Sequence, residues 1–565
     1  MKTRNKLYDK SRLRLLCLLT ALLGLFGAGQ TWAGNPTTLT VGGTNALNGG
    51  YWTTNADGTL TKASADNYNV YYDGSGTLTL KDATINGTNI IGHVGAGIYA
   101  EGDLTIVLEG SSTVTGVQDP NGESQSIRVS GNLTIQGDGS LTAQGAETSS
   151  RSSYGIYVTE SFTQQGGSVT AIGGNVSGNQ TSAGLYVSRG TVTVQSGTLT
   201  ATGGNTSGSS YGIYARGSVT VGSAAVTATG GSGNASYGLY IDSSSPSVNL
   251  SDNGSLTARS ESADRAGGIY VLNVFGSAGA VTVGDNSTLL ANSVILHDNS
   301  FNEKPLAPTG NGSWLIYGQS NQPSAVGGNY TLKENITIPS DAKVTIPEGS
   351  TLTIPEDKTL TADANQLVVN GELVLEGTFD NAKELEGSGN LVLGEITLTD
   401  DEGISEYAGY HLKLKSKKVT YTRTRALSDN SQYGTICLPF VPTSVADGQV
   451  TYYQVEKLGS NVITLVETDF EAGKPLFYRT SGTGDITFSA ESAAGVELVT
   501  IPATDSFMEG TMSVATPTAG YFLKNGNIYP IANGDKVKVK PFRAYVKGQN
   551  DASQASVMSV NVARP

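Results

Sequence analysis

The tetrapeptide Tyr154-Gly155-Ile156-Tyr157 decides the fold, because variants of it recur through the first half of the chain. Eight such tetrads occur, and their second residues lie 26 to 30 residues apart. Those second residues are Asn69, Gly97, Ser126, Gly155, Gly184, Gly212, Gly238 and Gly268. A fixed period of this length is typical of stacked units rather than of a globular domain with one closed core.

Each unit carries three short strand signals, for example at residues 184–187, 191–194 and 198–201. Val, Ile and Leu alternate there with Thr, Ser or Tyr, which is the pattern of a strand with one buried face. Glycines separate the signals, and no helical periodicity intervenes. The pattern predicts an all-β protein whose residues 34–300 form a right-handed parallel β-helix of about eight coils. At about 4.8 Å per coil, the seven steps give a rod of roughly 34 Å.

The residue that follows each second position is aliphatic in all eight tetrads. These residues are Val70, Ile98, Ile127, Ile156, Leu185, Ile213, Leu239 and Ile269. Stacked in register, they would form an apolar column inside the coils, each contributing about 1.5–3 kcal/mol before chain entropy is counted.

The next residue along must point the opposite way, to the outer face of the coil. It is tyrosine in seven of the eight tetrads, namely Tyr71, Tyr99, Tyr157, Tyr186, Tyr214, Tyr240 and Tyr270, and Arg128 in the remaining one. One interpretation is a flat platform on which sugar rings stack, with phenol hydroxyls bonding at the edges. The other is that stacked like residues simply stabilise parallel ladders. We hold these seven tyrosines as candidate binding residues and leave both interpretations open.

Gly-, Ser- and Asn-rich loops of variable length recur at one corner of the coil, at residues 173–182, 203–210 and 230–236. They are expected to line up along one edge of the rod. Solenoids often bind ligands along such an edge, but neutral tolerance of insertions gives the same pattern.

Residues 1–33 have the features of a secretory signal, with six basic residues, an apolar run at 15–28 and Thr31-Trp32-Ala33 as a cleavage site. Removal of this leader, which carries six basic residues and one acid, takes the formal charge from −14 to −19. So acidic a chain argues against a nucleic acid or an anionic membrane as partner. We expect an exported protein, extracellular or on the outer cell surface, with Cys437 as its remaining cysteine and with no transmembrane segment.

The remainder of the chain divides into further regions. Prolines break the repeat at 301–329. An eight-residue period then appears at Ile336, Val344, Leu352 and Leu360, which predicts further β-helix with tight corners over 330–400. Residues 401–425 form a basic linker or strand, interpreted as a solvated sheet edge guarded by lysines. Short non-repeating strand signals over 426–565 predict a β-sandwich.

No convincing catalytic or metal-binding set is found in the sequence. Asp73 and Glu101 follow the inner column by three residues in successive coils, and would stack about 4.8 Å apart, but a chance pair or a cation site is the simpler reading. Farther along that column, Arg216 and Asp242 are expected to form a surface ion pair. His93, His297 and His411 lie far apart in the sequence.

Calcium is an alternative at the Asp-containing turns 57–58, 138–139 and 252–254, but these are interpreted as turns, and no cofactor is predicted. Cys437 lies in an apolar setting typical of a buried structural thiol.

Two stretches resemble known families. Tyr51-Trp52, with residues 67–73 and 102–109, resembles the opening coils of pectate-lyase-like β-helix proteins, which gut anaerobes secrete and which are often labelled carbohydrate-binding or adhesin-like. The likeness covers roughly residues 50–300. Residues 433–440, 471–475 and 541–545 are similar to a C-terminal β-sandwich module of surface proteins from Gram-negative gut anaerobes, over about 425–548. Neither resemblance supplies a catalytic residue.

These observations favour a non-catalytic, adhesin-like β-helix protein that binds a polysaccharide or a surface glycan. The alternatives are a polysaccharide lyase or glycoside hydrolase on the same fold, and a structural stalk that displays the C-terminal module.

Overall fold

The computed structural model describes residues 34–563 apart from 88, 92–93, 119–121, 262–265, 274–278, 298–301, 319–323, 425–431, 447–448, 482–483, 525, 533–534 and 549–556. The predicted leader 1–33, His93 and Arg425 lie outside the described residues. The chain divides into two compact units at residues 312 and 313, inside the segment where prolines break the repeat. No helix in the described part combines the length and apolar character needed to cross a membrane.

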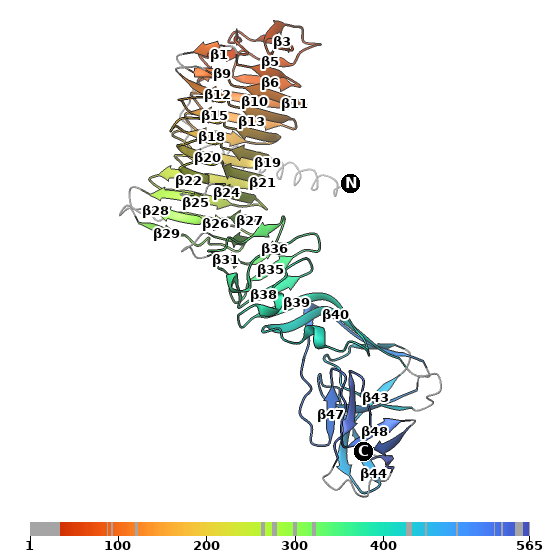
Figure 1. Ribbon diagram of the computed structural model, residues 1–565. Helices are drawn as coiled ribbons and strands as arrows, with labels where there is room; N and C mark the ends of the chain where they lie inside the picture. The colour runs from red at the N-terminus through yellow and green to blue at the C-terminus, as the bar shows by residue number, and fades with distance from the viewer. Residues whose placement is uncertain are drawn as a thin grey trace, which may run out of the picture. The chain divides into compact units, whose positions relative to one another are not determined.

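The first unit is a parallel β-solenoid (Figure 1). One of its faces is a ladder of eight parallel strands, which confirms the predicted parallel β-helix. The strands are β9 (Val94–Glu101), β12 (Glu123–Val129), β15 (Ser153–Val158), β18 (Ser182–Val187), β20 (Ser209–Ala215), β22 (Ala235–Ser243), β25 (Ala266–Asn273) and β28 (Val294–His297).

Two further faces complete each coil. The second face holds β6 (Thr77–Lys81), β10 (Leu104–Glu109), β13 (Leu133–Gly137), β16 (Phe162–Gln164), β23 (Ser247–Leu250) and β26 (Ala280–Val283). The third holds β7 (Thr84–Asn86), β11 (Ser111–Thr115), β14 (Ser140–Gln144), β17 (Ser168–Ile172), β24 (Ser255–Ser260) and β27 (Thr288–Ala291). In two coils these faces are joined in single bent strands, β19 (Val192–Thr202) and β21 (Val219–Gly230).

The aliphatic column lies inside the solenoid as predicted. Ile98, Ile127, Ile156, Leu185, Ile213, Leu239 and Ile269 are all fully buried and in register.

The recurring glycine beside this column has a steric cause. A Cβ at Gly184 would lie 2.4 Å from the Thr202 nitrogen and 2.6 Å from the Ala171 oxygen, both on the third face. The opposed backbones therefore approach too closely for a side chain. Ser126 is the exception, and its hydroxyl donates to the Val114 oxygen at 2.6 Å.

The N-terminal end differs from the predicted coil pattern. The tetrad at 68–71 does not open the ladder, because β5 (Val70–Tyr72) pairs antiparallel with β3 (Gly50–Thr54) and with β6. Together with β4 (Leu60–Lys62), these strands form an antiparallel meander at the end of the solenoid. The edge of β9 is covered by β1 (Thr38–Val41), which pairs with it antiparallel. Val70 is buried there, but outside the column.

At the other end the structure adds a coil that the tetrads do not show. Ser293, directly before β28, occupies the position that glycine holds in the tetrads. Ile295 lies opposite Tyr270, where the pattern would place a tyrosine. The antiparallel strand β29 (Glu303–Pro305) then closes the ladder.

The corner loops line up along one edge, as predicted, and they are bonded to one another. Short parallel bridges join Thr148 to Val176 and Val176 to Thr206. A column of buried serines fixes them: the Ser182 hydroxyl donates to the Gly174 oxygen and accepts from the Gly204 N–H, each at 2.8 Å. Each serine thus links the loop of its own coil to the loop of the next coil by hydrogen bonds, so the loops along this edge are fixed relative to one another.

The second unit opens with shorter coils. Its parallel strands are β31 (Ser324–Gly327), β32 (Asn329–Thr331), β33 (Ile336–Thr337), β34 (Val344–Ile346), β35 (Thr351–Ile354), β36 (Leu360–Thr361), β37 (Leu367–Val369), β38 (Glu372–Leu375), β39 (Asn390–Leu398) and β40 (Lys413–Arg423). The eight-residue motifs at Val344, Leu352 and Leu360 occupy three successive sides of one coil. Pro347 and Pro355 directly follow strands, where no ladder donor is needed.

The interpretation of the basic stretch as a guarded sheet edge is wrong. β40 lies inside a sheet, parallel to β39 on one side and antiparallel to β46 (Ile486–Glu497) on the other. Two of its lysines pair with acids, Lys417 with Glu376 and Lys418 with Glu395. These two lysines therefore balance neighbouring acids, and the stretch does not keep a further strand away.

Two more sheets follow, in an arrangement consistent with a sandwich. One holds β41 (Tyr433–Ile436), β45 (Leu476–Thr480), β43 (Val450–Leu458), β44 (Val462–Glu467) and β51 (Ser559–Val562). The other holds β47 (Met508–Thr511), β50 (Arg543–Val546), β48 (Tyr521–Lys524) and β49 (Asn527–Pro530). Residues of both sheets, such as Phe477 and Val546, share one core. Cys437 is fully buried, and burial raises the pKa of its thiol to about 12.

Candidate functional site

The outer face of the ladder carries a continuous column of side chains, which we call the tyrosine column. It consists of Tyr99, Arg128, Tyr157, Tyr186, Tyr214, Tyr240 and Tyr270, each in register with the next. Strand alternation places these side chains outside because the preceding aliphatic residues face the core. Six of the seven predicted tyrosines are thus brought together.

Tyr71 does not belong to the tyrosine column, and that prediction is wrong. It lies on β5 in the terminal meander, where its ring stacks on Tyr51 with centroids 4.4 Å apart. The sequence matches the tetrad pattern there, but the chain pairs antiparallel and never reaches the face of β9.

The rings of the column stack face to face along the solenoid. Tyr186 and Tyr214 have centroids 4.3 Å apart and planes inclined by 3°. The neighbouring pairs are similar, at 5.2–5.5 Å and 5–10°. At the N-terminal end the Arg128 guanidinium lies 4.6 Å from the Tyr157 ring centroid, a cation–π contact.

This stacking rules out the flat platform that the sequence had suggested. A platform needs exposed ring faces, whereas here each face inside the column is covered by the next ring. What remains accessible is the ring edges and the phenol hydroxyls. The ladder interpretation therefore describes the packing correctly, and each stacked pair contributes about 0.5–1.5 kcal/mol beyond its buried area.

A second set of tyrosines packs beside the column. Tyr154, Tyr211 and Tyr237 precede the glycines of their tetrads, and their rings lean on the column at angles between 49° and 63°. Tyr154 is 5% exposed and Tyr237 is 7% exposed, so these rings act mainly as packing. In the sequence they are the first residues of the tetrads YGIY and YGLY, but the repeat pattern does not predict their contacts with the column.

Acidic side chains accept hydrogen bonds from several column hydroxyls. Tyr99 donates to Glu101 at 2.9 Å, Tyr214 to Asp242 at 3.2 Å and Tyr270 to Glu303 at 3.2 Å. The predicted ion pair of Arg216 with Asp242 is present at 3.4 Å. Burial, aided by the Asp242 charge, raises the pKa of Tyr214 to about 12. Burial and neighbouring tyrosines also raise the pKa of Tyr186.

Exposure varies along the column. Tyr214 is 8% exposed and Tyr270 is 6% exposed, whereas Tyr99, Arg128, Tyr157, Tyr186 and Tyr240 are partly exposed. The accessible stretch is therefore centred on Arg128 and Tyr157. It offers hydroxyls and ring edges at the inter-strand repeat of about 4.8 Å, with one cation among them.

The predicted stacking of Asp73 on Glu101 does not occur, because Asp73 lies in the turn after β5, whereas Glu101 ends β9. Asp73 accepts hydrogen bonds from the N–H groups of Ser75 and Thr77 in a turn, and Glu101 accepts from the hydroxyls of Thr38 and Tyr99. These bonds lower the pKa of Glu101. Both acids serve local structure.

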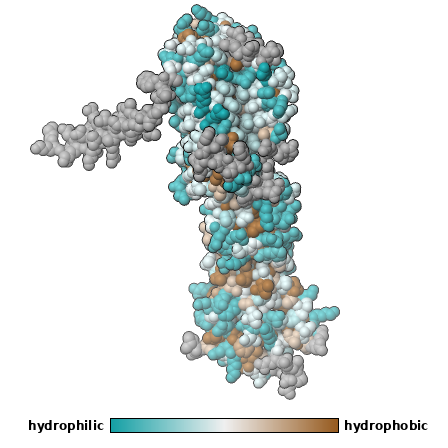
Figure 2. All heavy atoms as spheres, turned by 90° about the vertical axis from the view of Figure 1, so that its left-hand side faces the viewer, coloured by the Kyte–Doolittle hydropathy of each residue, from teal (hydrophilic) through white to brown (hydrophobic). Residues whose placement is uncertain are grey.

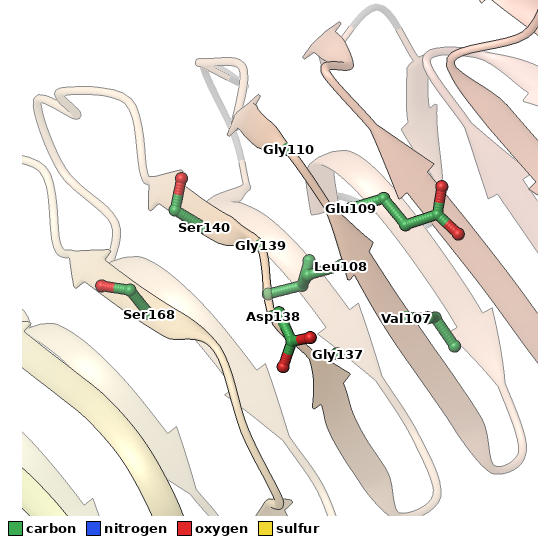
Figure 3. Close-up of a pocket in the computed structure, with 9 residues that line it drawn as sticks. All are labelled: Val107, Leu108, Glu109, Gly110, Gly137, Asp138, Gly139, Ser140 and Ser168. Carbon is green, nitrogen blue, oxygen red and sulfur yellow. The ribbon is translucent and has the colours of Figure 1, made fainter.

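A different pair of acids lines a hollow of about 520 Å³ at the corner between the second and third faces (Figure 3). Glu109 ends β10, and Asp138 lies at the corner of the next coil, with Ser140 and Ser168 also lining the hollow. Both carboxylate side chains are exposed, and in Figure 3 they do not point toward one another. The sequence showed Asp138 only as a turn residue.

No three His, Cys, Asp or Glu side chains converge as metal ligands in the part of the chain that the structure describes. The Asp-containing sequences suggested for calcium form turns. Asp57 accepts from the N–H and the hydroxyl of Thr59, while Asp252 and Asn253 adopt φ of 53° and 69°.

The face of the first unit seen in Figure 2 is largely hydrophilic, with hydrophobic residues only scattered over it. Among the described residues, large hydrophobic side chains that are exposed occur in the second unit, at Val441, Val462, Val499, Ile501, Val514 and Val557. A ligand of the solenoid would thus meet polar groups and tyrosine edges.

Comparison with known proteins adds little. No protein-family model and no curated protein matches the chain. One solved structure is similar, a tailspike protein mutant of the E. coli bacteriophage HK620 in complex with a pentasaccharide. It is 12% identical, with a TM-score of 0.16, and the match covers 84% of this chain and 88% of that one. A likeness this low carries no argument about function.

Proposed function

We propose that the solenoid is a non-catalytic, adhesin-like glycan-binding rod, and that an extended oligosaccharide lies along the tyrosine column. The observation that carries this proposal is the outward-facing series from Tyr99 to Tyr270, in register over seven strands, in which the neighbours from Tyr99 to Tyr186 are all partly exposed. Hydroxyls repeated at a constant spacing match a ligand that is itself a chain of similar units. Ligand sites generally combine aromatic side chains with a small number of fixed polar groups, and the column supplies both.

The stacking geometry specifies how such a ligand would bind. Because the ring faces are covered, the sugar would contact hydroxyls and ring edges. Arg128 would add a charged donor at the exposed end. The rings of Tyr157, Tyr186, Tyr214 and Tyr240 are each held by two column neighbours, so little ordering entropy would be lost when a ligand binds them. The leader predicted at residues 1–33 and the resemblance of the sequence to gut-anaerobe proteins support a location outside the cell.

The test is a glycan-array screen of the mature chain, repeated with Tyr157, Tyr186 and Tyr214 replaced together by alanine. We expect binding to be lost while the β-sheet circular dichroism and a cooperative unfolding transition remain. Tyr51→Ala is the matched control, because it removes a stacked tyrosine that lies off the column. Binding that survives the triple replacement would remove the tyrosine column from the proposal, and an empty array would favour the stalk.

The acid-lined hollow favours one second candidate, a glycoside hydrolase that uses Glu109 and Asp138. Paired carboxylates on one surface are the minimum requirement for hydrolysis. Their exposure weighs against it, because a general acid needs burial or a close like charge to stay protonated at neutral pH. New reducing ends released from plant or host glycans, and lost in Glu109→Gln and in Asp138→Asn, would establish this alternative.

A further inference from the structure

The second unit contains a cluster of buried charges that the repeat pattern gave no reason to expect. Arg543, on β50, donates to the Tyr421 hydroxyl and, at 2.8 Å, to Asp400. The Tyr421 hydroxyl donates to the other oxygen of Asp400 at 2.7 Å. The side chains of Arg543 and Asp400 are only 11% and 9% exposed. This triad neutralises one arginine with one carboxylate.

A second arginine lies beside the triad. One Nη of Arg423 donates to the Thr435 oxygen, and the guanidinium lies 5.0 Å from the Tyr478 ring centroid. Burial and the nearby charge of Arg543 lower the pKa of Arg423. Among the described residues, no carboxylate forms an ion pair with Arg423. The site therefore holds more positive charge than its own acids compensate.

Arg423, Thr435 and Arg543 line a cavity of about 200 Å³, which we call the arginine pocket. Lys538 and Lys540 add two more cationic side chains to its lining, and Phe522 and Leu523 contribute an apolar wall. Lys540 is 3.6 Å from Asp401, whereas Lys538 is exposed at the pocket and has no ion pair in the described part of the chain. The cavity thus combines a cationic lining with an apolar wall.

We propose that the arginine pocket binds a small oxyanion, a carboxylate, phosphate or sulfate carried by a ligand with an apolar face. Arginine presents paired donors that match such groups, and burial strengthens each of these hydrogen bonds. An anion between Arg423 and Lys538 supplies the countercharge that the cluster lacks. The pocket belongs to the second unit, so the proposal is independent of glycan binding by the tyrosine column.

The experiment is titration calorimetry of the full mature chain in low-salt buffer with inorganic phosphate, sulfate and glucuronate, and with glucose as the uncharged counterpart of glucuronate. We expect one site per chain for at least one of the oxyanions, no heat with glucose, and weaker binding at high salt. A preference for phosphate or sulfate identifies a tetrahedral anion, and a preference for glucuronate identifies an acidic sugar. Absence of binding by all three oxyanions overturns the proposal.

Lys538→Gln is the decisive variant, because this exposed lysine lines the pocket without supporting the core. It should weaken binding by about tenfold, as expected for one charge-assisted hydrogen bond. Lys457→Gln is the matched control, since it also removes an exposed lysine, here from β43 and away from the pocket lining. Equal affinities in the two variants would assign the binding to general surface charge and refute the site. Arg423→Lys keeps the positive charge but loses the paired donors of the guanidinium. The affinity of this variant for the oxyanion should lie between those of the wild type and of Lys538→Gln.

Discussion

The tyrosine column and the arginine pocket are assembled in opposite ways. In the column, one position of one motif is repeated, and each side chain meets its own counterpart in the next coil. In the pocket, Arg543 reaches partners 122 and 143 residues away in the chain, and no position is repeated. The first surface is redundant, because a missing ring leaves the others stacked. The second depends on single contacts.

This difference predicts the largest mutational effect in the pocket. Arg543→Met leaves the Asp400 carboxylate buried without its countercharge, which should cost about 3–5 kcal/mol of unfolding free energy. Chemical denaturation, followed through the unfolding transition of the second unit, measures this loss of unfolding free energy. Arg543→Met combined with Asp400→Asn removes both charges and should recover most of the loss. If the single and double variants are equally destabilised, packing rather than charge pairing explains the effect.

The repeat has its own point of vulnerability, which is the glycine rather than the tyrosine. Gly184→Ala forces a Cβ against the backbone of Thr202 and Ala171, and overpacking of this kind costs about 1–3 kcal/mol. Thermal and urea unfolding should both report it. Gly394→Ala is the control, because this glycine on β39 has no atom within 4 Å of the added Cβ. A loss as large at Gly394 as at Gly184 would contradict the steric explanation.

The same contrast explains what the sequence could and could not predict. Periodicity revealed the coils, the buried Ile156 series and the outward tyrosines, because parallel in-register stacking turns a sequence repeat directly into a spatial column. It failed at Tyr71, where a matching tetrad pairs antiparallel, and at β28, where Ser293 and Ile295 conceal a true coil. A sequence motif shows only which side chains alternate. The direction in which a strand pairs at either end of the solenoid depends on the segment that covers the last coil.

The covered ring faces and the arginine pocket were beyond the sequence for a different reason. Alternation places a tyrosine outside, but only ring tilt decides whether its face or its edge meets solvent. In the pocket, Arg423 reads as one more charge on a basic strand. Its partly buried position follows from the way β40 packs beside the sheets that contain Thr435 and Arg543, and these are separated from it by non-repeating sequence.

The smallest predicted effect is a loss of unfolding free energy at alkaline pH, which comes from a tyrosine of the column. Because burial and the Asp242 charge raise the pKa of Tyr214 from 10.0 to about 12, the unfolded chain loses this proton before the folded chain does. Stability from this group is therefore complete below pH 10 and is lost as the pH rises through 12, by about 1 kcal/mol between pH 9 and pH 11.

Tyr214→Phe removes the ionising group, so its unfolding free energy should fall less steeply over that range. Asp242→Asn removes one cause of the raised pKa and should shift the tyrosinate absorbance of the folded protein toward lower pH. An unchanged slope in Tyr214→Phe would mean that the ring is stacked but its hydroxyl titrates freely. In that case the hydroxyl would be fully hydrated before any ligand arrives, and its contribution to binding a sugar would have to exceed the cost of displacing that water.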